Sequence, residues 1–552
     1  MRNQQHRYIS EGERQAIDYA RQWATTFSRR GLLKAFGAAG AASVLTPSVL
    51  AAAPTGGIIP SRARRQDGGS TLRIARGQLT DSLDAQKTAL LVAHEIMWQI
   101  YDTLIYLDEA GTVHPGLATE WTISEDGMSV TYKLREGVTF HDGTPFDATI
   151  VQQTVARHQD PATASPTSYM LGPLDTVEVV DPMTVVYTYT APFAPMFVGL
   201  GYSYCAPISI PAATQFGDQF GRNPVGTGAY KFVEWSADDT IVLEANAEHT
   251  WSTTFYTTQQ PPAIQRVEFV VIPEDATRLA ALESGEIDVV AGTDAVPTDK
   301  IRSLEQTDGV TVVKRDAVGV YYAYLNQQIA PLDNLLVRQA INHAVDRDKL
   351  VQLVLDGQGK PATSALASAF SAYNPNLTQY AYDPEKAAAL MAEAGLEAGF
   401  EIKYLNIASP VYQRAAESIQ EDLSKINIKL NIESYPVAEW VPKGASGEYG
   451  IQFFYYTYSD PDILYLAFRT GQAFSWSHQD DAELDAWLDE QQVTFDTTVR
   501  NDLLFKAQAR INDQALSLLL WEGVYAAAAR SEVQNLAIDL VGFIHLQEMS
   551  LT

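Results

Sequence analysis

The chain has 552 residues, with 39 lysines and arginines against 67 aspartates and glutamates, a formal charge of −28. This charge excludes nucleic acid and anionic membranes as main partners, because both are bound through dense lysine and arginine. The length exceeds what one hydrophobic core organises and predicts two or more domains. Cys205 is the only cysteine, which excludes an internal disulfide and a cysteine metal site, and we expect it to be a small buried side chain.

The first 53 residues have the pattern of an export signal. Arg29 and Arg30 are followed by Lys34 and by a weakly apolar run, residues 35–53, that ends in three alanines. Glycine, serine and proline dilute this run, which favours a removable signal over a permanent membrane span. The pattern resembles a twin-arginine signal, which implies folding before export to the periplasm. No cysteine lies near its end, so we expect that the protein is not a lipoprotein.

Residues 54–70 are rich in glycine, proline, serine and arginine and predict a flexible leader. The next five residues alternate as a first strand, and residues 77–84 read as the loop that leaves it. A helical pattern follows from Leu91. Within it, His94 and Glu95 look like the start of a zinc motif, but no second histidine stands one helical turn later. We therefore expect a solvated or capping pair and no metal site.

The middle of the chain alternates strands with helices. Residues 111–148 contain short alternating runs separated by acidic-glycine pairs, which predict antiparallel hairpins. The glycines of residues 223–235 lack the spacing of a phosphate-binding loop. Residues 267–290 predict a strand, a helix and a second strand, and a further helix is expected between Asp383 and Gly395. These patterns predict an α/β protein.

Seven segments resemble the large solute-binding proteins of ABC importers for peptides, nickel chelates and related solutes. They lie in the family's order at residues 101–121, 134–148, 223–232, 272–290, 337–362, 382–396 and 459–462. The resemblance implies a two-lobed periplasmic-binding-protein clamp of type II, with an extra subdomain in lobe one. Lobe one would combine residues 71–317 with 525–552 and carry the subdomain at about 111–200. Lobe two would span residues 318–524.

This resemblance also implies the function. We expect a periplasmic component that captures a peptide-like or other small polar solute between its lobes and delivers it to a membrane permease. The implied partners are the permease and ATPase subunits of an ABC transporter, the implied state is a monomer, and no cofactor is expected. Ligands bind where two domains meet because closure there removes the solute from water.

The segment before the Ser-Asp-Pro-Asp motif, residues 453–462, lines the cleft in the resembled family. Peptide binders carry an aspartate there that pairs with the peptide's amino terminus, whereas this chain has tyrosines, and Asp460 belongs to the motif itself. A buried ammonium without a carboxylate is costly, which speaks against ordinary peptides. Alternating aromatic residues in a strand are also typical of a core, so both interpretations of the tyrosines stay open. The expected ligand-binding residues are Gln78, Thr80, Ser82, Tyr321, Tyr455, Tyr456, Thr457, Tyr458 and Trp476.

Three alternatives remain beside peptide capture. Tyrosine faces and hydroxyls suit an oligosaccharide or opine. An envelope receptor or chaperone without transport would use the same fold. An enzyme is the rival class that the sequence speaks against, because it has no Gly-x-Ser-x-Gly elbow, no histidine pair at metal spacing and no cysteine cluster.

Overall fold

The computed structural model describes residues 70–552, except 109, 110, 238, 255, 258, 259, 293, 294, 473 and 540. The expected twin-arginine signal and all but the last residue of the expected leader lie outside the described residues. In the part that is described, no helix combines the length and apolar character needed to cross a membrane.

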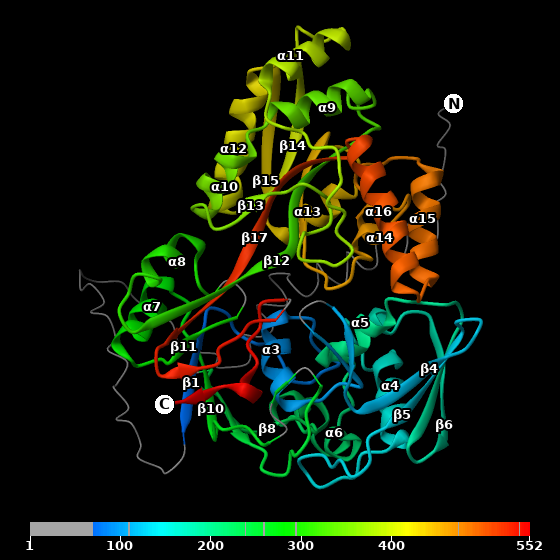
Figure 1. Cartoon of the computed structure of the whole chain (residues 1–552), viewed down its shortest axis with the longest axis vertical. Coiled ribbons are helices and arrows are strands. Elements are labelled where there is room, and N and C mark those ends of the chain that lie inside the picture. Colours follow the sequence, from blue (N-terminus) through cyan, green and yellow to red (C-terminus); the bar gives the residue numbers. More distant parts are fainter. Residues whose placement is uncertain are drawn as a thin grey trace, which may run out of the picture.

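Two lobes share two long antiparallel strands, β12 (Val310–Leu325) and β17 (Ser517–Arg530). Figure 1 shows these strands running from the upper lobe, lobe two, into the lower lobe, lobe one. Their register is interrupted between Asp316 and Val320, where the chain passes from one lobe to the other. The predicted lobe boundaries at residues 317 and 524 fall inside these two strands.

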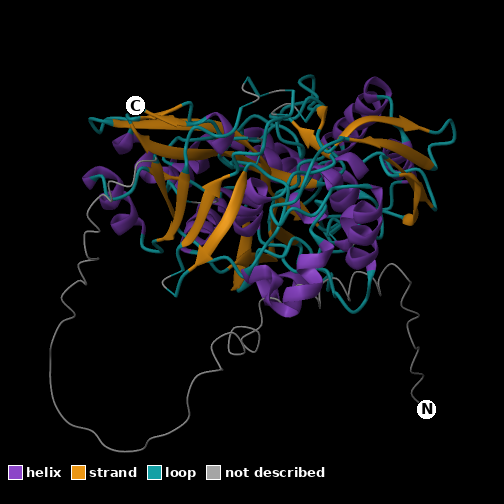
Figure 2. Cartoon of the chain, turned by 90° about the horizontal axis from the view of Figure 1, so that it is seen from below, coloured by secondary structure: helices purple, strands orange, loops and turns teal. Residues whose placement is uncertain are grey.

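The strands of both lobes are linked through this pair into one hydrogen-bonded path, with helices on both sides (Figure 2). The order is β15 (Ile428–Tyr435), β14 (Phe400–Ile407), β16 (Ile451–Tyr456), β12, β17, β11 (Val289–Val290), β1 (Thr71–Arg76), β10 (Arg266–Val271), β9 (Ile241–Ala245) and β8 (Tyr230–Trp235), with β13 (Lys360–Pro361) on β17.

In lobe one, β1 lies between β10 and β11 and is parallel to both. The helix α7 (Asp275–Ser284) connects β10 to β11 and ends at Gly285, whose φ of 78° suits glycine. The predicted strand, helix and strand at residues 267–290 are therefore confirmed. The predicted helix from Leu91 is confirmed as α3 (Leu91–Ile100), which packs on the sheet.

The subdomain of lobe one is a four-stranded antiparallel sheet in the order β4 (Ala118–Ile123), β5 (Ser129–Leu134), β7 (Thr184–Tyr189) and β6 (Leu174–Asp181), covered by α4 (Ala148–Gln159). The predicted hairpin between β4 and β5 turns at Gly127, with φ 68°. The other elements of lobe one are β2 (Ile105–Leu107), β3 (Val113–Pro115), α5 (Met196–Gly201), α6 (Ile210–Phe216), α8 (Thr298–Leu304), β18 (Val533–Gln534) and β19 (Ser550–Leu551). Cys205 is buried, as expected, and burial raises its thiol pKa to about 12.

In lobe two, side chains alternate between two cores on opposite faces of the sheet. One core lies under α9 (Leu335–Ala344), α10 (Arg347–Leu355), α11 (Pro384–Glu393) and α12 (Pro410–Ser424). The other lies under α13 (Val437–Gly444), α14 (Ile463–Phe468), α15 (Ala482–Val493) and α16 (Thr497–Asp513). Asp383 caps α11 by accepting from the Lys386 amide, which confirms the predicted helix start.

Candidate functional site at the lobe junction

The two lobes touch beside the shared strands. The hydroxyls of Tyr202 in lobe one and Ser459 in lobe two lie 2.5 Å apart. The Ala194 amide of lobe one donates to the Gln492 carbonyl of lobe two, at 2.6 Å. In Figure 1 the lower ends of α15 and α16 face the subdomain that carries α5 and β4. A solute held between the lobes would lie next to these contacts.

Tyr321 and Tyr455, both predicted as ligand residues, are brought together by the sheet. Tyr321 on β12 pairs with Tyr455 on β16 and with Trp521 on β17. Its ring stacks on Tyr455 at 3.9 Å between centroids and 6° between planes, and on Trp521 at 4.9 Å and 20°. Gly319 leaves room for the Tyr455 ring, which a Cβ at that position would overlap. Both tyrosines are half-buried, so they belong to the edge of the core that reaches the junction.

A group of hydroxyls lies beside this stack. The Thr457 hydroxyl donates to the Tyr455 hydroxyl at 2.7 Å. Tyr525, on β17, lies near Thr457 and Tyr455, and its buried hydroxyl is close to Thr457 but makes no hydrogen bond of good geometry. Burial, and then the neighbouring Tyr455, raises the pKa of Tyr525 well above its ordinary value. Tyr458 is half-buried and packs against the lobe-two core.

Tyr525 was missed by the sequence argument. The only sequence feature that indicates it is its position, where the chain is predicted to pass from lobe two back to lobe one. Its ring lies over Gly542, where an added Cβ would come within 2.6 Å. The side chain of Tyr456, another expected ligand residue, lies outside what the structure describes.

The loop after β1 contains the other three expected ligand residues, Gln78, Thr80 and Ser82. Gln78 is exposed, and Thr80 is buried with a hydroxyl that has no hydrogen-bond partner. The Ser82 hydroxyl instead accepts from the Asp84 amide at 3.0 Å, and Gly221 packs against it. Ser82 therefore shapes the loop, which leaves Gln78 and Thr80 as its candidates for solute contact.

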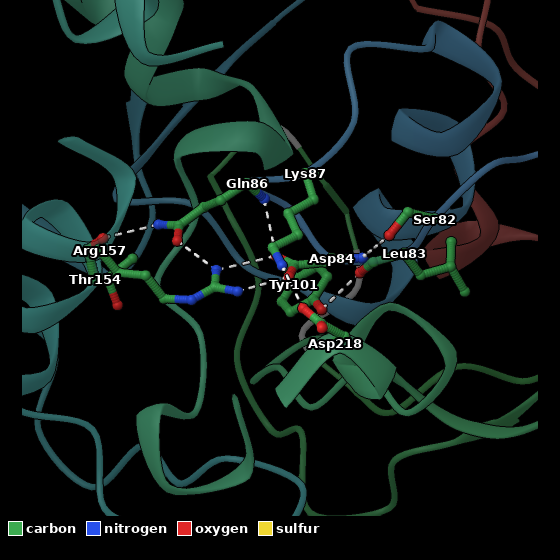
Figure 3. Close-up of polar contacts among 9 residues, drawn as sticks. All are labelled: Ser82, Leu83, Asp84, Gln86, Lys87, Tyr101, Thr154, Arg157 and Asp218. Carbon is green, nitrogen blue, oxygen red and sulfur yellow. Dashed lines mark hydrogen bonds and ion pairs between the residues drawn. The ribbon is translucent and has the colours of Figure 1, made fainter. Parts of the chain in front are cut away.

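A buried ion pair fixes this loop in place (Figure 3). Arg157 on α4 donates to both carboxylate oxygens of Asp84, at 3.0 and 2.6 Å, and to the Gln86 side chain. Gln86 donates in turn to the Thr154 carbonyl at 2.8 Å, and Tyr101 donates to the Leu83 carbonyl at 2.9 Å. The loop that presents Thr80 is thus anchored to the subdomain.

The Ser-Asp-Pro-Asp motif is held by a polar network of its own. Arg500 on α16 donates to both oxygens of Asp460, at 3.1 and 2.5 Å. Asp462 accepts from the side chains of Gln491 and Gln492, the latter at 3.1 Å. Asp460 is therefore occupied by Arg500 and does not offer a free carboxylate to a solute ammonium.

The stability of the fold is expected to depend on pH through Asp462. Burial, and then repulsion from Asp460, raises its pKa from 3.8 to about 7 against the opposing effect of Arg500. A carboxyl whose pKa is raised by folding stabilises the fold fully below about pH 3.8 and loses that contribution as the pH rises through about 7. We expect the melting midpoint to fall over this range by less in Asp462→Asn than in the parent chain. Parallel slopes in thermal melts at about pH 5 and about pH 8 would contradict the assignment.

Two expectations need correction. Trp476 is only 1% exposed and lies in the lobe-two core, with Trp440 at 4.9 Å and Phe454 at 5.4 Å between ring centroids, so it does not line the junction. His94 and Glu95 are not solvated, because both are buried in lobe one. Glu95 pairs with Arg76 at 3.1 Å. Burial lowers the pKa of His94 to about 3, which keeps the ring neutral.

The chain matches a known protein family over about two thirds of its length. Residues 112–476 match the model for bacterial extracellular solute-binding proteins, family 5. The chain belongs to this family. Family 5 binding proteins are periplasmic solute-binding components of ABC importers, which confirms the expected solute-binding role, and the two-lobed α/β clamp is confirmed with it.

Relatives of this family 5 protein cover most of its length. It is 28% identical to the dipeptide-binding protein of Escherichia coli over 491 residues, 82% of this chain and 89% of the relative. It is 30% identical to heme-binding protein A of Haemophilus influenzae over 450 residues, 76% and 80% of the two chains. The solved structure of HbpA2 from Haemophilus parasuis superposes with a TM-score of 0.80 at 26% identity, covering 87% of this chain and all of the other. The names of these relatives thus refer to different ligands although the fold is shared. The residues of the binding site, and not the fold, decide which ligand is bound.

Among the described residues, no group of three or more histidine, cysteine, aspartate or glutamate side chains is arranged to hold a metal ion.

Proposed function

We propose that this family 5 protein is exported by its twin-arginine signal and works in the periplasm as a monomer without a lipid anchor. It captures a peptide-like or other small polar solute between its lobes and hands it to an ABC permease with its ATPase. Membership of a family of solute-binding proteins supports this proposal, and so do the contacts between the lobes at Tyr202 and Ser459. Closure around the solute brings both lobes into contact with the permease together.

Two buried hydroxyls carry the proposal, one on the shared strand β17 and one in the loop after β1, which the family resemblance places at the cleft. These hydroxyls, of Tyr525 and Thr80 respectively, make no hydrogen bond of good geometry within the protein. Leaving a buried polar group unpaired costs about 1–3 kcal/mol, so a bound solute that pairs with them recovers that free energy. The proposed solute contacts are Gln78, Thr80, Tyr321, Tyr455, Thr457, Tyr458 and Tyr525.

The charges around the junction favour a solute without a free ammonium group. Asp460 is bound by Arg500, Asp539 lies 3.3 Å from His545, and Glu95 is paired with Arg76. These carboxylates already have partners, whereas the hydroxyls beside Tyr455 are neutral and lie next to a stacked aromatic face. Hydroxyls and aromatic faces together suit a hydroxylated or amide-rich solute, such as an oligosaccharide or a peptide with a blocked amino terminus.

A thermal-shift screen of the full chain tests the proposal with di- to pentapeptides, N-acetylated peptides, oligosaccharides, opines and nickel chelates. A solute at 100 times its Kd stabilises the folded chain by about 2.7 kcal/mol. We expect oligosaccharides or blocked peptides to raise the midpoint. A larger shift with free peptides would refute the preference for uncharged groups but keep the transport role. No shift with any class would favour the receptor or chaperone alternative.

Tyr525→Phe is expected to weaken binding of whichever solute the screen identifies by about 2- to 10-fold, the equivalent of one net hydrogen bond. Because the hydroxyl makes no hydrogen bond of good geometry within the protein, its removal should leave the melting midpoint of the unliganded chain unchanged or slightly raised. Isothermal titration calorimetry of both chains measures the first effect. The matched control is Tyr449→Phe, which removes a hydroxyl that is bonded to Glu433 within lobe two. Equal affinities of Tyr525→Phe and the parent chain would remove Tyr525 from the site.

A further inference from the structure

Three contacts between the lobes involve two neighbouring segments of lobe two, and further contacts, such as that of Arg302 with the Asp356 carbonyl, lie elsewhere. Ser459 meets Tyr202, and the Gln492 carbonyl meets the Ala194 amide. Phe495, just after α15, packs against the hydrophobic core of the subdomain of lobe one, beside Gly127. These three residues come from two different segments of lobe two. Interactions within lobe two must therefore hold the two segments in a fixed relative position.

The carboxylates of the Ser-Asp-Pro-Asp motif provide that connection. Asp460 directly follows Ser459 and also accepts from the Asp462 amide at 2.7 Å, which fixes the loop that carries Ser459. Asp462 accepts from the side chain of Gln492, whose carbonyl receives the Ala194 amide. The network thus connects directly to two of the three contacts with lobe one.

Arg500 closes the network from the opposite side. Its Nε donates to the Gln491 side chain at 3.1 Å while its two terminal nitrogens hold Asp460. A single guanidinium therefore ties the motif loop to the end of α15. The phenols of Tyr458 and Tyr465 also lie close to this network.

A network of buried ionic side chains is unusual if its role is only to stabilise lobe two. Two buried carboxylates face a single cation, and apolar residues of similar volume usually stabilise a core as well or better. Buried ionic groups have directional hydrogen bonds, however, and these fix the relative position of two segments more narrowly than apolar packing does.

We propose that Asp460, Asp462 and Arg500 form a latch scaffold that positions Ser459 and Gln492 against lobe one and so sets how firmly the clamp stays closed. The scaffold does not touch the solute. Its effect on affinity arises because contacts made only in the closed form add to the free energy of closure. This inference goes beyond the proposed solute, since the latch can be examined without any solute.

Hydrogen exchange of the Ala194 amide tests the latch. This amide belongs to lobe one, whereas Asp462 belongs to lobe two, so a purely local role of Asp462 would leave its exchange unchanged. In the full chain without added solute, we expect Asp462→Ala to accelerate exchange in the peptide that contains Ala194 by at least about 10-fold, the equivalent of about 1.4 kcal/mol of lost closure. Exchange in β1 of lobe one should stay the same.

The control is Asp489→Asn on α15, the helix that carries Gln492, because Asp489 forms a partly exposed ion pair with Arg469 within lobe two. It should leave the Ala194 peptide unchanged. If Asp462→Ala does not fold, Tyr202→Phe and Ser459→Ala remove the contact itself and should each accelerate the same peptide. Unchanged exchange at Ala194 in every folded variant would overturn the latch, whatever solute the screen identifies.

Discussion

Replacing Arg157 with methionine is expected to lower the free energy of unfolding of lobe one by about 3–5 kcal/mol. The change leaves Asp84, whose side chain is 2% exposed, as a buried charge without its cation. Gln86 also loses a partner, so the loop after β1 is held to α4 only by the hydrogen bond from Gln86 to the Thr154 carbonyl (Figure 3). We expect solute affinity to fall as well, because the same loop presents Thr80. The measurement is the melting midpoint of the full chain together with solute titration.

Lys87→Met is the matched control for this prediction. Lys87 pairs with Asp218 in the same region at 3.1 Å, but the Asp218 side chain is 95% exposed. Exposed pairs contribute about 0–1 kcal/mol, since water solvates each charge nearly as well. If Arg157→Met lowered the midpoint no more than Lys87→Met does, the buried pair would not be what anchors the loop.

Trp521→Ala is expected to destabilise lobe two by about 3–5 kcal/mol. Trp521 is fully buried, stacks on Tyr321 and lies at the centre of one of the two lobe-two cores. Its loss opens a cavity beneath the ring that supports Tyr455, so the aromatic face at the junction should also loosen. We expect weaker solute binding together with the lower midpoint.

Trp521→Phe separates ring packing from hydrogen bonding. The indole nitrogen is buried without a hydrogen-bond partner, so its removal should stabilise slightly or cost nothing, and the phenyl ring still stacks on Tyr321. We expect the phenylalanine variant to lose less than half of what the alanine variant loses. Tyr382→Ala, at a side chain that is 41% exposed, should change the midpoint little. Equal losses in the alanine and phenylalanine variants would mean that the nitrogen has a role that the packing does not explain.

Local chemistry made part of the fold predictable. The turn at Gly127, the helix end at Gly285 and the cap at Asp383 each depend on residues within a few positions, so their conformations follow from the neighbouring sequence. The strand, helix and strand at residues 267–290 followed from periodicity in the same way. The family resemblance then placed the seven segments into a clamp that the comparison confirms.

Only some residues of the candidate site could be predicted from the sequence. Alternation along β12 and β16 indicates that neighbouring tyrosines lie on opposite faces, but it does not say which face a helix covers. Trp476 was expected at the site and lies in the core because α13 supplies Trp440 to cover it. Tyr525 was missed because it becomes a neighbour of Tyr455 only when β16 and β17 both pair with β12.

The sequence by itself determined the α/β class, the local turns and caps, the acidic surface and the membership of a solute-binding family. Only the tertiary structure decided which polar groups are buried and what they face. Glu95 was expected to be solvated or to cap the helix, and instead pairs with Arg76 in the interior of lobe one. Asp460 is bound by Arg500, which lies 40 positions later in the chain. Burial and ion pairing depend on contacts between remote segments, and those contacts exist only once both lobes have folded.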